Sequence, residues 1–128
     1  MTIQEFIDKN HIGFTSKRID HRPDNLMDDN MRHFKCTIKH NKIYMIAYFS
    51  QGSAHFKDPT CADVLGCLAS DCQGFSSYSF EDWASELGMD TDSRKAEKTY
   101  KAIGKQYDAL LRVLRGDLFN ELLECEAM

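Results

Sequence analysis

The sequence has no long apolar segment, only two prolines and a single tryptophan. Its longest apolar run, residues 43–49, is far shorter than the roughly 20 residues that a membrane-spanning helix needs. The first ten residues contain Glu5 and Asp8 but no basic leader, so they do not fit a secretory signal. We therefore expect a cytoplasmic protein that makes no contact with a membrane.

Motifs of the common enzyme classes are also missing. There is no GxSxG nucleophile elbow and no helical HExxH. The stretch IGKQ, which contains Lys105, lacks the upstream glycine and the following Ser or Thr of a phosphate loop. Asp28 and Asp29 are neighbouring carboxylates in a polar stretch, where solvation is the simplest expectation. We predict a protein that is not an enzyme and holds no cofactor.

The five cysteines form no CxxC pair, and their odd number is typical of reduced thiols. A zinc site is the alternative, because His55 precedes three of them, but the spacing HFKDPTCADVLGCLASDC fits no zinc-ribbon or zinc-finger pattern. On a helix, Cys61 and Cys72 share a face with apolar residues and Cys67 lies off it. We expect core packing for the first two and no metal site.

An N-terminal half with strands is expected to precede a helical half. Thr2 and Glu5 match a capping box for a short helix over residues 3–9. Residues 12–19 are weakly strand-like, and residues 21–30 are polar and predict a loop. Strict alternation over residues 33–39, a turn at 40–42 and the apolar residues 43–50 predict a hairpin. Because residues 43–50 are apolar on both faces, we place that strand in the middle of the sheet.

The second half carries start and stop signals for about four helices. One begins near Pro59 and ends between Cys72 and Gly74, and another begins after Ser79 and ends at Gly88. A long helix follows to Arg115, and a short one covers the last residues. We predict one α+β domain over 1–128: a short helix and a three-stranded antiparallel sheet in 1–57, then helices in 58–128 that pack on one side of the sheet.

Charge is strongly segregated along the chain, although its net value is only −4. Residues 58–92 contain eight acidic side chains and no Lys or Arg, whereas residues 93–116 contain seven basic and two acidic ones. The tail, 117–128, has four acids and no base. The predicted long helix therefore has a basic face between two acidic segments. The candidate partner-binding residues on it are Arg94, Lys95, Lys98, Lys101, Lys105, Arg112 and Arg115.

Three interpretations of this basic face remain open. It can be solvated or pack beside the acidic helix, where each surface ion pair contributes only about 0–1 kcal/mol. It can bind nucleic acid, as a regulatory protein using residues 93–115, but the acidic flanks and the lack of interleaved aromatics weigh against that use. It can contact a protein, because segregated charge steers encounter and selects partners. The acidic segment, as a mimic of nucleic-acid phosphates, is an alternative surface: Asp63, Asp71, Glu81, Asp82, Glu86, Asp90 and Asp92.

The run FEDW…E-G-DTDSRKAE-TY resembles a widespread family of small uncharacterised proteins carried by bacteriophages and prophages, and the resemblance covers about residues 44–123. It implies a phage accessory protein with no known reaction. Small accessory phage proteins often inhibit host defences by binding, so we expect an anti-CRISPR or other anti-defence inhibitor that acts in the bacterial host cell on a defence protein or ribonucleoprotein such as a CRISPR effector. The residues that carry the resemblance are Phe80, Glu81, Asp82, Trp83, Glu86, Gly88, Asp90, Thr91, Asp92, Ser93, Arg94, Lys95, Ala96, Glu97, Thr99 and Tyr100.

A homodimer is a further possibility at the C-terminal end of the chain. The last predicted helix would expose Leu118, Phe119, Leu122 and Leu123 in a monomer, and an exposed apolar patch of that kind often marks an interface.

Overall fold

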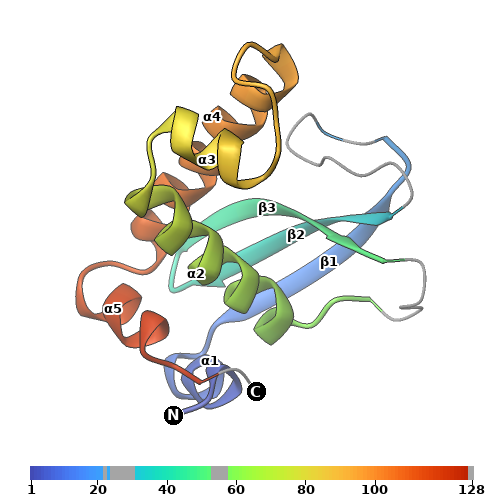
Figure 1. Ribbon diagram of the computed structural model, residues 1–128. Coiled ribbons are helices and arrows are strands. Elements are labelled where there is room, and N and C mark those ends of the chain that lie inside the picture. Colours follow the sequence, from blue (N-terminus) through green and yellow to red (C-terminus); the bar gives the residue numbers. More distant parts are fainter. Residues whose placement is uncertain (22, 24–30, 53–57, 127–128) are drawn as a thin grey trace.

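The computed structural model describes residues 1–21, 23, 31–52 and 58–126 (Figure 1). Most of the predicted loop over residues 21–30 lies outside this description. The chain is α+β, with a three-stranded antiparallel sheet in its N-terminal half and mostly C-terminal helices. Its elements are α1 (Ile3–Asn10), β1 (Gly13–Ile19), β2 (Arg32–His40), β3 (Ile43–Gln51), α2 (Cys61–Ser77), α3 (Phe80–Glu86), α4 (Arg94–Val113) and α5 (Asp117–Leu123).

The sheet has the order β1-β2-β3, and alternate residues of its strands point to opposite faces. On β2, Phe34, Cys36 and Ile38 are buried against the helices, as the alternation predicts. The helices lie on one side of the sheet (Figure 1). Directly paired residues of neighbouring strands point to the same face, so the β1 and β3 partners of these three residues also face the helices. The other face of the sheet points away from the core.

Our placement of residues 43–50 in the middle of the sheet is wrong. Within the described residues β2 is the central strand, and β3 pairs only with β2. Met45 and Ala47 of β3 are buried, but Tyr44 and Ile46 on its other face are exposed. The apolar residues on both faces of this segment predicted a strand buried on both sides. In the structure only the face with Met45 and Ala47 is covered.

The helices start where the sequence provides caps. In α1 the Glu5 backbone N–H donates to Thr2 Oγ1 at 3.1 Å and the Thr2 backbone N–H donates to Glu5 Oε1 at 3.4 Å, which completes the predicted capping box. Thr60 and Asp63 form the same motif in α2. Ser79 caps α3 by accepting from the Asp82 N–H. Each cap satisfies backbone donors that the first helical turn leaves unpaired.

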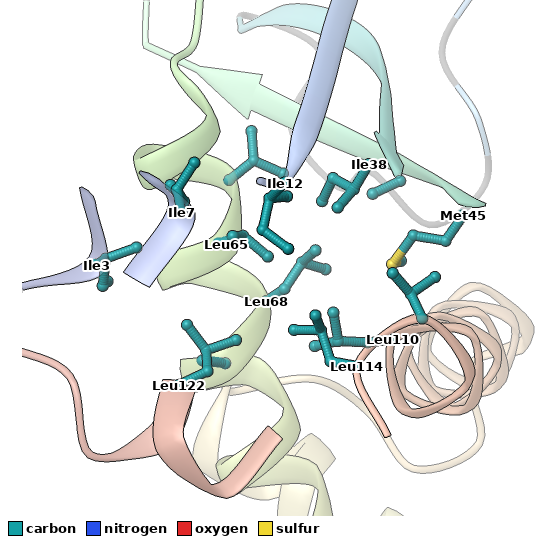
Figure 2. Close-up of a cluster of buried hydrophobic side chains, with 14 of the residues drawn as sticks. Ile3, Ile7, Ile12, Ile38, Met45, Leu65, Leu68, Leu110, Leu114 and Leu122 are labelled. Carbon is teal, nitrogen blue, oxygen red and sulfur yellow. The ribbon is translucent and has the colours of Figure 1, made fainter. Parts of the chain in front are cut away.

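The main core lies between the sheet and four of the helices (Figure 2). Leu65 and Leu68 of α2 occupy its middle, and Leu110 and Leu114 reach it from the end of α4 and the residue that follows it. Ile38 of β2 closes it on the side of the sheet. A second, smaller cluster joins α3 to the first half of α4; its buried members are Trp83, Ala84 and Ala96.

Two helix ends differ from the predicted ones because of tertiary packing. The α2 helix continues past Gly74 to Ser77, and its Phe75 ring packs 4.7 Å from the Tyr100 ring, centroid to centroid. The α4 helix ends at Val113, and Leu114 leaves the helical conformation with its side chain fully buried. Arg115 therefore lies beyond the helix on which we had placed it.

The C-terminal helix is part of the core. Phe119 and Leu122 are buried, and Leu118 and Leu123 pack against the main cluster as half-buried side chains. The expectation that these four residues are exposed in a monomer is wrong, and the reasoning for a dimer through this helix loses its basis. The helix is held near α1 by an ion pair of 3.0 Å between Lys9 Nζ and Glu121 Oε1.

Candidate binding surfaces

The α4 helix carries an exposed row of cations, which we name the α4 basic face. Successive members are three, four or seven residues apart, and at about 100° per residue these steps keep them on one side of the helix. The opposite side holds the buried residues Ala96, Leu110 and Val113. Lys95, also exposed, lies to one side of the row, and Arg115 follows the helix end. The members of the α4 basic face are Arg94, Lys98, Lys101, Lys105 and Arg112.

Two acidic residues of α4 itself, Glu97 and Asp108, lie on this face. Lys101 Nζ is 2.9 Å from Glu97 Oε1, one turn earlier. The hydrogen bond from Lys101 and its charge hold the pKa of Glu97 below the ordinary value, with a smaller contribution from Arg94. Asp108 interrupts the row in its second half and is exposed. The α4 basic face thus presents more positive than negative charge to solvent.

Arg94 and Lys95 lie in the first turn of α4, where cations are least favourable because the helix dipole is positive there. Ser93 caps the helix, with the Ala96 N–H donating to Ser93 Oγ at 3.3 Å. Just before it, the Asp92 N–H donates to Asp90 Oδ1 at 2.9 Å, which fixes a turn that carries two carboxylates. These carboxylates lie in the turn before the positive helix end, where their charge is favourable.

The acidic residues of 58–92 are all exposed, but they do not share one helix face. Asp63 is part of the α2 cap, where its Oδ2 accepts from the Thr60 N–H at 3.1 Å. Asp71 lies eight residues further along α2, about 12 Å along the helix axis. Glu81, Asp82 and Glu86 are on α3, and Asp90 and Asp92 belong to the turn before α4.

A cleft of about 550 Å³ lies between β3, α2, α3 and α4. Aromatic side chains of Phe75, Tyr78 and Trp83 line it, with the carboxylates of Asp71 and Glu86. No Lys, Arg or His is among its lining residues within the described part of the chain. Asp71 keeps an exposed surface, but the surrounding atoms of the cleft wall partly desolvate its carboxyl group, and this desolvation raises its pKa. Aromatic faces beside carboxylates suit a cationic or apolar group, since a cation is attracted by both.

Sequence reasoning did not find this cleft. Its aromatic residues come from β3, from α2 and the residue after it, and from α3, so they are spread along the sequence from Tyr48 to Trp83. The one indication available was the absence of Lys and Arg throughout residues 58–92, which contribute most of the lining.

The cysteines behave as the helical pattern predicts. Cys36 and Cys72 are buried, Cys61 is half-buried and Cys67 is exposed. Burial raises the pKa of Cys36 to about 11 and that of Cys72 to about 12. A nucleophilic cysteine needs a lowered pKa, so these thiols are not activated.

Cys67 provides a test of the electrostatics at the cleft. Burial, and then the charges of Asp71 and Asp63, raise its pKa. Because Cys67 is the exposed cysteine, iodoacetamide should label it before the other thiols. Because its pKa is raised, the pH midpoint at which the labelling rate is half-maximal should be higher than in a free cysteine peptide. Asp71→Asn should lower this midpoint. Mass spectrometry of labelling rates between pH 7 and 10 measures it, and a midpoint at or below that of the peptide would contradict the assignment.

No family model, curated protein or solved structure matches this chain. Within the residues that the structure describes, no group of three or more His, Cys, Asp or Glu side chains is arranged to hold a metal ion. None of the described helices is both long and apolar enough to cross a membrane.

Proposed function

We propose that this protein acts by binding, and that the α4 basic face is the surface that meets its partner. The observation that supports this is the exposure of five cations in a row on a helix whose other side is anchored in both hydrophobic clusters. A rigid, predominantly positive row of this kind steers association with an oppositely charged surface and selects against basic ones.

An acidic protein surface fits better than a nucleic acid. The chain is acidic overall, and the eight acids before the row and the four after it would repel a long polyanion that extends beyond α4. The aromatic side chains of α4, Tyr100 and Tyr107, pack against the hydrophobic clusters and the Phe75 ring rather than among the exposed cations of the helix. A protein partner needs only a local acidic patch, which this arrangement allows.

The proposed biological role is that of a phage-encoded inhibitor of a host defence, in which the protein occupies a CRISPR effector or another defence complex and blocks it without catalysis. Two features support this class: the resemblance carried by residues 80–100, and a surface built for charge-selective contact. The first turn of α4, where the resemblance is densest, is also where the α4 basic face begins.

The test expresses the protein in a set of bacterial hosts that each carry one CRISPR subtype or one other defined defence. We expect the plating efficiency of a susceptible phage to rise in the host whose defence is the target, and the purified protein to bind that host's purified effector. If plating is unchanged in every host and no purified effector binds, the proposed role is wrong.

A further inference from the structure

The face of the sheet that points away from the core is exposed over its Lys35–Lys39 end, and we name the outward residues there the open sheet face; His33, the next outward residue of β2, is buried. The strand register places these residues in rows: Lys39 beside Tyr44, then Thr37 between Thr15 and Ile46, then Lys35 between Lys17 and Tyr48. Each row is separated from the next by two residues along the strands, about 7 Å.

The open sheet face combines exposed apolar groups with a single sign of charge. Tyr44 is 58% exposed and Ile46 is 41% exposed, so two of the large hydrophobic residues most exposed in the described chain lie here. Lys17, Lys35 and Lys39 are exposed beside them. None of the outward-pointing strand residues carries a carboxylate. This face therefore has no local counter-charge from its own strands.

The position of two lysines on this face is unfavourable for the protein alone. Lys17 and Lys35 are directly opposite each other in the β1–β2 ladder, and like charges in that relation destabilise a sheet. An anion placed between them would remove the repulsion. The exposed Tyr44 ring, the half-buried Tyr48 ring and the facing lysines thus call for the same ligand, one that has both flat apolar surfaces and negative charge.

We propose that the open sheet face binds single-stranded nucleic acid. Unpaired bases stack on Tyr44 and Tyr48, which are on the same side of β3 and about 14 Å apart along the strand. Lys39 lies across the ladder from Tyr44 and Lys35 from Tyr48, so each stacked base has an ammonium group close by for its phosphate. A duplex is disfavoured because its base faces are already stacked and a flat sheet cannot stack on them.

This inference goes beyond the proposed function and uses a different surface, so the two can fail separately. The acidic character of the whole chain does not oppose it, because a short strand covers only the sheet and need not cross the acidic helices. An acidic peptide is the competing ligand. It would use the lysines but gain nothing from stacking on the tyrosines.

The experiment measures fluorescence anisotropy of fluorescein-labelled dT12 and U12 with the full chain at 50 mM salt, and a labelled polyglutamate peptide as the competing probe. Tyr44→Ala should weaken oligonucleotide binding by roughly 5- to 150-fold, the range for loss of one base stack, and Tyr44→Phe should retain it. Replacing Lys17, Lys35 and Lys39 by alanine should reduce the salt slope by about 2, since each single-strand phosphate contact contributes about 0.7. The dT12 and U12 arms distinguish DNA from RNA.

The matched control replaces Lys101, Lys105 and Arg112 of the α4 basic face by alanine, which removes the same charge from another surface. We expect this control to leave the affinity for both oligonucleotides within twofold of the unmodified protein, and circular dichroism to show that all variants are folded. The inference is overturned if neither oligonucleotide binds, if the control loses as much affinity as the sheet variants, or if polyglutamate binds equally well and Tyr44→Ala has no effect.

Discussion

Leu110→Ala is expected to lower the free energy of unfolding by about 2–5 kcal/mol. Leu110 is fully buried on the inner side of α4, in the main core with Leu65 and Leu114 (Figure 2). Truncation removes its transfer free energy and leaves a cavity that the surrounding side chains fill only in part. Because a domain has only about 5–15 kcal/mol of stability in total, a substantial share would be lost.

Urea denaturation followed by circular dichroism measures this loss. Arg112→Ala is the matched control, because it lies two residues away on the exposed side of the same helix and should change stability by no more than about 0.5 kcal/mol. If both variants lose the same stability, Leu110 is not on a buried side of α4 and Arg112 is not on a solvent-exposed side.

Trp83→Ala is expected to lower the free energy of unfolding by about 3–5 kcal/mol. The loss of protection should be greatest in α3. The Trp83 ring packs 5.3 Å from the Tyr100 ring and 6.3 Å from the Phe80 ring, centroid to centroid, and fixes α3 on α4. The α3 helix spans only Phe80–Glu86, which is too short to be stable in isolation. Without the indole, its attachment to the rest of the molecule should weaken.

Hydrogen exchange measured by mass spectrometry locates this effect, because amides of α3 should exchange faster while those of β2 change least. Leu87→Ala is the control: Leu87 is 51% exposed at the end of the same helix, so its truncation creates no cavity. Unchanged protection of α3 in Trp83→Ala would contradict the role assigned to the second cluster.

Local rules predicted much of the fold. Capping residues such as Thr2 and Ser93 define helix starts through contacts within four residues of the chain, and the alternation of β2 follows from one buried face. What the sequence could not supply depends on distant contacts. The extension of α2 past Gly74 depends on where Phe75 meets Tyr100, and the edge position of β3 depends on which strands pair with it.

Of the candidate surfaces, too, one follows from local spacing in the sequence and the others depend on contacts between distant residues. The α4 basic face follows from helical spacing, and in the structure its five residues are exposed. The open sheet face needed the register, because Lys35 and Tyr48 are thirteen residues apart in sequence and become neighbours only through the β2–β3 ladder. The cleft needed four elements in their final places.

The most direct test of the central claim compares two triple variants of the α4 basic face in the host where the protein restores phage plating. Lys101→Glu with Lys105→Glu and Arg112→Glu reverses the charge, and Lys101→Arg with Lys105→Arg and Arg112→Lys preserves it. Like charges brought together at an interface cost several kcal/mol, so we predict that the reversed variant loses at least about 30-fold in affinity and no longer restores plating, while the conservative variant does. Equal restoration by both variants would contradict the claim that this face binds the partner.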